Sequence, residues 1–199
     1  MTLLYWLFFI GFLYSVGLVA KRIAQPSLSE WILVSFLMFV GSVIPSGFIL
    51  SALHLTASVV AWIVSTFLLL AAQYFLWGKL TTTPQYSIRA IIANRRQTLR
   101  SWFAELSPYL KFLYSSLFGT LVIIGVTNLL LVLFTVPNEW DSMTGHLNRV
   151  IRYIQHGTMA HFGGTNWNMD TYPKSVTGIQ IYTYLITGKI ENAMKFIHH

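Results

Sequence analysis

Four long runs of apolar residues alternate with shorter polar segments along the chain up to residue 136. They cover residues 3–20, 31–53, 55–77 and 112–136, and none of them contains Asp, Glu, Lys or Arg. The hydrocarbon core of a bilayer is about 30 Å thick, and a helix needs roughly 20 apolar residues to cross it. The pattern therefore predicts four transmembrane helices in an all-α membrane protein.

The composition agrees with this prediction. Hydrophobic residues make up 55% of the 199 residues and charged residues 10%, whereas a soluble domain carries roughly 25% charged residues. A freely soluble domain is therefore excluded. A disordered chain is excluded as well, because such chains are poor in apolar and aromatic residues. Cysteine is absent, which excludes disulfides, thiolate metal sites and a cysteine nucleophile.

The positive charges predict the orientation of the spans. Lys21 and Arg22 directly follow the first apolar run, and no charge precedes it, so this run is an uncleaved helix rather than a secretory signal. Segment 79–111 carries most of the remaining cations against Glu105 alone. Cytoplasmic loops are rich in Lys and Arg, so both basic segments are predicted to be cytoplasmic. Alternation then places both termini and residues 137–199 on the extracytoplasmic side.

The cytoplasmic segment has the pattern of a helix lying on the membrane surface. Over residues about 87–107 the apolar side chains recur at helical spacing, and Arg89, Arg96 and Arg100 gather along one flank of that stripe. Interfacial helices place aromatic residues at the headgroup level and cations toward anionic lipid. Nucleic acid is not the predicted partner, because the aromatic residues lie on the apolar face and not among the arginines.

The segment after residue 136 predicts a short amphipathic helix over residues about 142–156. Its apolar stripe is formed by Leu147, Val150, Ile151 and Ile154, spaced as one face of a helix. The opposite face gathers the polar residues His146, Arg149, Arg152, Tyr153 and His156.

Two carboxylates, Glu139 and Asp141, stand just before this helix, where the fourth span leaves the membrane. A carboxylate there can accept a proton from a hydroxyl or amine nucleophile, while Arg and His side chains can hold a phosphate. Such an array suits transfer of a group from a lipid phosphate. Two structural interpretations stay open: Asp141 can cap the helix, or it can pair with Arg149.

A resemblance to a known family favours the catalytic interpretation. The run Pro-Asn-Glu-Trp-Asp-Ser-Met-Thr-Gly-His-Leu-Asn-Arg-Val over residues 137–150 resembles the first large extracytoplasmic loop of bacterial C-type (GT-C) membrane glycosyltransferases. It is similar to that of the family-39 protein mannosyltransferases and of the aminoarabinose transferases of lipid A. Gly145 stands where those proteins have a tyrosine, so a tyrosine contact to the ligand is not carried over.

The resemblance implies a membrane glycosyltransferase that uses a polyprenyl-phosphate-linked sugar as donor, in the bacterial cytoplasmic (inner) membrane. It implies Asp141 as the catalytic residue, with Glu139 as second candidate, and a divalent metal is a possible cofactor. We assign His146, Arg149 and Arg152 to substrate binding. No metal-ligating residues are predicted, since His156 and His161 have no carboxylate partner at helical spacing.

The predicted organisation is a four-span region, 1–136, followed by an extracytoplasmic loop, 137–199. Enzymes of the resembled kind have more membrane helices than four. The chain is therefore predicted to be the N-terminal part of such a transferase, inactive alone. The alternative function is a non-catalytic membrane subunit or assembly factor, in which the apolar stripe of the outer helix docks a partner.

Overall fold

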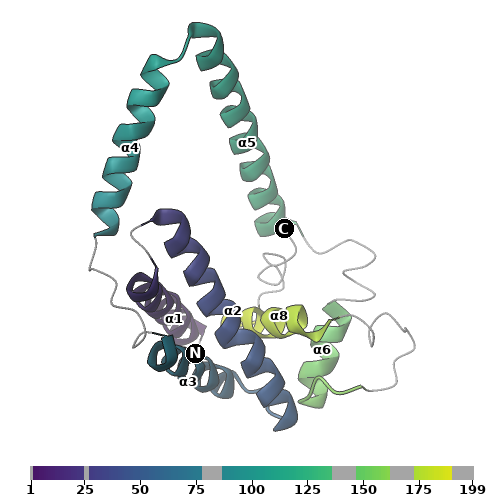
Figure 1. Cartoon of the computed structure of the whole chain (residues 1–199). Coiled ribbons are helices and arrows are strands. Elements are labelled where there is room, and N and C mark those ends of the chain that lie inside the picture. Colours follow the sequence, from purple (N-terminus) through teal and green to yellow (C-terminus); the bar gives the residue numbers. More distant parts are fainter. Residues whose placement is uncertain (1, 25–26, 78–86, 136–146, 162–172, 190–199) are drawn as a thin grey trace.

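The computed structural model describes residues 2–24, 27–77, 87–135, 147–161 and 173–189. The regular structure within these segments is entirely helical (Figure 1). The helices are α1 (Thr2–Ile23), α2 (Leu28–Ala52), α3 (Val59–Trp77), α4 (Ile88–Glu105), α5 (Pro108–Phe134), α6 (Leu147–His156) and α8 (Lys174–Ile186). Four of them, α1, α2, α3 and α5, are long and apolar enough to cross a membrane. The prediction of an all-α membrane protein with four candidate spans is confirmed.

The observed helices start within a few residues of the predicted runs, and two of the differences have local causes. Helix α3 begins at Val59 and not at residue 55, because His54 has a positive φ of 58° and the Leu55 N–H donates to the Leu50 carbonyl at 2.8 Å. Helix α5 begins at Pro108 and not at residue 112. Proline suits the first turn of a helix because its missing N–H is not needed there.

Helices α1, α2 and α3 pack together in the lower part of the molecule (Figure 1). Polar side chains tie them to one another. The Arg22 guanidinium of α1 donates to the Tyr74 hydroxyl of α3 at 2.7 Å, and Gln73 Nε2 of α3 donates to Ser42 Oγ of α2 at 2.8 Å. Side-chain hydrogen bonds between membrane helices each contribute about 0.6–2 kcal/mol to stability. Because this contribution is small, the main effect of these bonds is to specify which faces of the helices meet.

Helix α8 crosses α2 and completes the core of this bundle (Figure 1). Its Tyr182 ring lies 6.0 Å from the ring of Phe12, 5.8 Å from that of Trp62 and 6.3 Å from that of Phe39. Edge-to-face and tilted aromatic contacts at these distances add to the area that the rings bury. The C-terminal part of the described chain is therefore joined to the first three helices by a shared aromatic core.

Helices α4 and α5 form a hairpin that extends away from the bundle, at the top of Figure 1. The two helices touch near their turn, where the rings of Trp102 and Tyr114 lie 5.2 Å apart and Lys111 Nζ donates to the Ala104 carbonyl at 2.8 Å. No described side chain of α4 or α5 is buried. The predicted interfacial helix over residues about 87–107 thus exists as a helix, and its placement on the membrane stays a prediction.

Candidate functional site

Two of the predicted site residues, Arg149 and Arg152, lie on α6, which docks on the turn between α2 and α3. The Thr56 N–H of that turn donates to the Gly157 carbonyl at 3.1 Å, and Thr56 Oγ1 donates to the Tyr153 carbonyl at 3.0 Å. From the other side, the Met159 N–H donates to Ser51 Oγ at 2.7 Å. These three bonds join Ser51 and Thr56, on either side of the turn, to α6 and to the residues that directly follow it, and they hold the helix at this end of the bundle.

The chain leaves α6 through Gly157, which the docking requires to be glycine. Gly157 has a positive φ of 69°, the left-handed conformation that commonly ends a helix. A Cβ at this position would lie 2.9 Å from the His54 carbonyl oxygen. The lack of a side chain at Gly157 is thus what lets α6 approach the α2–α3 turn.

The buried face of α6 coincides only in part with the apolar stripe that the sequence pattern predicted. Arg149, Val150 and Tyr153 are the buried residues of this helix, whereas the pattern placed Arg149 and Tyr153 opposite the apolar stripe. Leu147 and Ile154 of the stripe also pack against the core, but they are only partly buried. Helix α6 contacts α8 as well as the α2–α3 turn, so more than one of its sides is covered by protein.

The two candidate cations of α6 therefore occupy different surroundings. Arg149 is 1% exposed, whereas Arg152 is half-buried, with its Nε donating to Asn148 Oδ1 at 3.4 Å. Because Arg149 is covered by protein, it is suited to holding another side chain in position. Arg152 is only half-buried, so it can still contact a ligand that arrives from outside. The other predicted site residues, Glu139, Asp141 and His146, lie outside the described residues.

The burial of Arg149 narrows the choice of carboxylates that can neutralise it. A guanidinium is always charged, and a buried charge is strongly unfavourable without an opposite charge and hydrogen bonds. The chain has six acidic residues. Glu30 lies in the first turn of α2, at the opposite end from α6, and Glu105 lies at the turn between α4 and α5. The remaining acids are Glu139, Asp141, Asp170 and Glu191, all outside the described segments.

Sequence reasoning missed α8 altogether. This helix buries the polar side chains of Thr177 and Gln180 along with Tyr182, and it contacts α6. Its composition mixes Thr, Gly, Gln and Tyr with aliphatic residues, so it shows neither a long apolar run nor a clear amphipathic stripe. The signals that mark it are Pro173 immediately before its first residue and Gly188 shortly after its last, the usual asymmetry of helix ends.

The described residues define the class of the protein and give no metal site. They form a helical membrane protein with four candidate spans, a basic hairpin and two shorter helices that close one end of the bundle. Within the described segments no group of three His, Asp or Glu residues could hold a metal ion. No protein-family model matches the sequence, and no curated protein and no solved structure matches it either.

Proposed function

We propose that the chain forms part of a membrane glycosyltransferase that uses a polyprenyl-phosphate sugar, with its reacting groups around α6. The observation that carries the proposal is the placement of α6, the first described helix after the fourth span, which docks on the α2–α3 turn and buries Arg149. The resemblance of residues 137–150 to the outer loop of GT-C transferases supports the same location. Alternation of the spans puts this end of the bundle on the extracytoplasmic side.

The proposed reaction is a displacement at the anomeric carbon of the donor sugar. The Asp141 carboxylate takes the proton of an acceptor hydroxyl or amine, whose lone pair forms the new bond to the anomeric carbon. The bond from that carbon to the phosphate oxygen breaks, and polyprenyl phosphate leaves with the electron pair. Arg152, which is half-buried, stabilises the charge on the departing phosphate.

The structure changes the proposed role of Arg149 from substrate binding to positioning. Its side chain is covered, so a donor phosphate arriving from outside would meet Arg152 first. A buried guanidinium beside a carboxylate fixes that carboxylate in one orientation through paired hydrogen bonds. In this proposal Arg149 holds the catalytic acid, and Glu139 is the second candidate for that acid.

The test measures binding of the donor lipid to this chain in lipid nanodiscs, and sugar transfer by the complete transferase of which the chain is proposed to form part. Polyprenyl phosphate is the probe for binding, and Arg152→Gln is expected to weaken it about tenfold, as the loss of a charge-assisted hydrogen bond does. Asp141→Asn is expected to retain binding and to lower transfer by about 10²–10⁴-fold, the usual contribution of a general base. Glu30→Gln removes the same charge at the far end of α2 and serves as control.

Two results would end the proposal. One is a wild-type chain that binds no polyprenyl phosphate, and the other is a complete transferase in which Asp141→Asn leaves sugar transfer at the wild-type rate. The alternative function, a non-catalytic subunit that docks a partner on the apolar stripe of α6, is placed second. Leu147, Val150 and Ile154 of that stripe already pack against the core of the same chain, which leaves little of it for a partner.

A further inference from the structure

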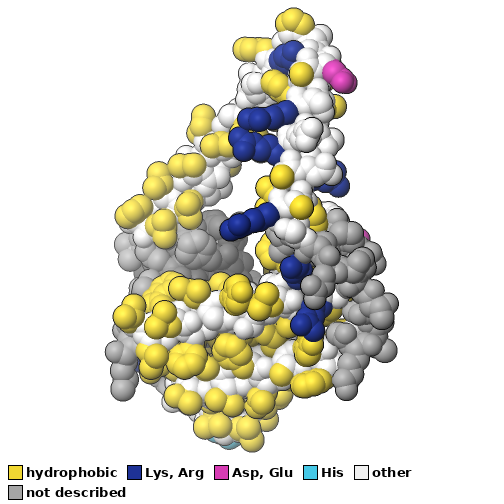
Figure 2. All heavy atoms as spheres, turned by 90° about the vertical axis from the view of Figure 1, so that its left-hand side faces the viewer, with side chains coloured by type: hydrophobic (Ala, Val, Ile, Leu, Met, Phe, Trp, Pro, Cys, Tyr) yellow, Lys and Arg dark blue, Asp and Glu magenta, His cyan; other side chains and the backbone are white. Residues whose placement is uncertain are grey.

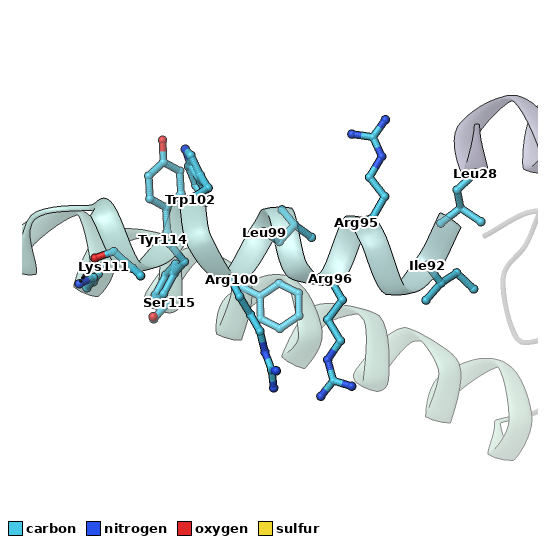
Figure 3. Close-up of a pocket in the computed structure, with 13 residues that line it drawn as sticks. Leu28, Ile92, Arg95, Arg96, Leu99, Arg100, Trp102, Lys111, Tyr114 and Ser115 are labelled. Carbon is cyan, nitrogen blue, oxygen red and sulfur yellow. Dashed lines mark hydrogen bonds between the residues drawn. The ribbon is translucent and has the colours of Figure 1, made fainter. Parts of the chain in front are cut away.

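The hairpin of α4 and α5 encloses a groove that the proposed function does not use. Between the two helices runs an open groove with a cavity volume of about 1030 Å³. The turn of the hairpin closes one end, and Leu28, the first residue of α2, lies at the other (Figure 3). The groove lies along α4 and the first half of α5, away from the end of the bundle where α6 docks (Figure 1).

The walls of this groove are apolar and uncovered. Leu99 is 61% exposed, Trp102 44% and Phe118 69%, and all three line the groove. If nothing covered these side chains, each would expose a large apolar area to water. Such exposure costs roughly 25 cal/mol of free energy per Å² of apolar surface. The hydrocarbon of a bilayer covers such side chains without this cost in free energy. Trp102 and Tyr114 also line the groove, and Trp and Tyr are the residue types that gather at the level of the lipid headgroups.

The same groove is rimmed by cations. Arg96 and Arg100 lie one helical turn apart on α4, and in Figure 3 both side chains extend toward the side where α5 lies, while Arg95 points the other way. Lys111 of α5 also lines the groove. The Lys111 ammonium has three N–H donors, and one of them donates to the Ala104 carbonyl.

The hairpin as a whole is strongly basic. Figure 2 shows Lys and Arg side chains spaced along one arm of the hairpin. Helix α4 carries four arginines and α5 adds Lys111, against the single acid Glu105. An anion is therefore the charge-complementary occupant of the groove. A polybasic surface attracts anionic lipid with about 1 kcal/mol per basic residue.

We propose that the groove between α4 and α5 binds an anionic phospholipid of the surrounding bilayer. The phosphate group contacts Arg96, Arg100 and Lys111, and the acyl chains lie on Leu99 and Phe118. The two apolar walls suit a lipid with two chains, and the groove lies on the side that the positive-inside rule assigns to the cytoplasmic leaflet, where anionic lipids are abundant. The site is independent of α6 and therefore of the proposed transfer reaction.

The experiment is native mass spectrometry of the full chain, titrated with phosphatidylglycerol or with phosphatidylcholine of the same acyl chains. The wild-type protein is expected to bind phosphatidylglycerol at least tenfold more tightly. Arg96→Gln with Arg100→Gln should remove this preference, since two basic contacts account for about that factor. Both arginines are exposed, so the double variant should keep the helical content of the wild type by circular dichroism.

The matched control is Lys21→Gln with Arg89→Gln, which removes two charges that do not line the groove. It should change the affinity for phosphatidylglycerol less than twofold. Equal binding of the two lipids, an undiminished preference in the Arg96/Arg100 variant, or an equal loss in the control would each overturn the proposal. Tighter binding of polyprenyl phosphate than of phosphatidylglycerol, abolished by the same double variant, would also overturn it by assigning the groove to a different lipid.

Discussion

Gly47 of α2 and Gly178 of α8 lie face to face where the two helices cross. A Cβ on Gly47 would lie 3.5 Å from the Gly178 Cα, and a Cβ on Gly178 would lie 4.0 Å from the Gly47 Cα. Small residues at a crossing let two helix backbones approach closely, as in other membrane helix pairs. This contact brings α8 near enough for Tyr182 to reach the aromatic rings of α1, α2 and α3.

The two glycines should respond differently to the same substitution. A methyl group on Gly47 would lie 3.1 Å from Cη2 of Trp62, whose indole is buried and donates to the Thr56 carbonyl at 2.9 Å. Overpacking of this kind costs roughly 1–3 kcal/mol, more than the roughly 1 kcal/mol that alanine gains over glycine in a helix. Gly47→Ala should therefore lower the thermal midpoint of the protein in detergent.

Gly178→Ala is the matched comparison, because its Cβ would find only ordinary van der Waals contact. We expect it to leave the midpoint unchanged or to raise it, since alanine favours the helix. A Gly178→Ala protein that is less stable than the Gly47→Ala protein would contradict the observed order of the two distances.

Gly157→Ala should release α6 from the α2–α3 turn. The new Cβ would lie 2.9 Å from the His54 carbonyl oxygen, a backbone atom that cannot rotate away, and the residue would keep a φ of 69°. Strain of this kind costs about 1–3 kcal/mol. Hydrogen exchange should show faster exchange at Thr56 and Met159, whose N–H groups make the docking bonds. Gly11→Ala, with open space around it, is the control and should change neither.

The four spans could be predicted from the sequence because each is a long run without charge, and a helix is the form that satisfies its own backbone in lipid. Their exact starts depended on local geometry that apolar runs do not encode. At His54 the positive φ and the turn that follows place the start of α3 after Leu55, although Leu55 is an apolar residue like most of those in the helix.

The interior of the site could not be predicted in the same way. Periodicity places the apolar side of α6 correctly at Val150, but it assumes one buried face, whereas this helix is covered by both α8 and the α2–α3 turn. Arg149 and Tyr153 are both buried in this arrangement. The contact with α8 could not be anticipated, because the sequence of α8 shows no clear periodic signal.

Tyr182 should anchor α8 mainly through its ring. Tyr182→Ala removes the contacts to Phe9, Phe12 and Trp62, and loss of a buried aromatic side chain costs about 3–5 kcal/mol. Tyr182→Phe removes only the hydroxyl and keeps the ring, so the expected loss in unfolding free energy is about 1 kcal/mol. Unfolding titrations in mixed micelles should rank wild type above Tyr182→Phe and well above Tyr182→Ala. Equal losses in the two variants would mean that the hydroxyl, and not the ring, holds α8.

The charge of Arg149 should be neutralised by Asp141, one of the four acids left once Glu30 and Glu105 are excluded by position. Breaking a buried ion pair from either side costs about 3–5 kcal/mol, because the remaining charge stays buried. Arg149→Gln and Asp141→Asn should each destabilise the protein by about that amount, and the double variant by much less than their sum. Unfolding free energies of the four proteins give the coupling directly.

Arg152 supplies the control for this cycle, since it lies on the same helix and is only half-buried. Asp141→Asn and Arg152→Gln should be additive to within about 0.5 kcal/mol. Additivity between Asp141 and Arg149 would contradict the pairing, and the same cycle with Asp170 would then identify the partner. Strong coupling with full loss of sugar transfer in Arg149→Lys would show that the pair acts in catalysis, because lysine keeps the charge but not the planar fork of the guanidinium. Strong coupling with transfer retained in Arg149→Lys would leave the pair a structural role alone.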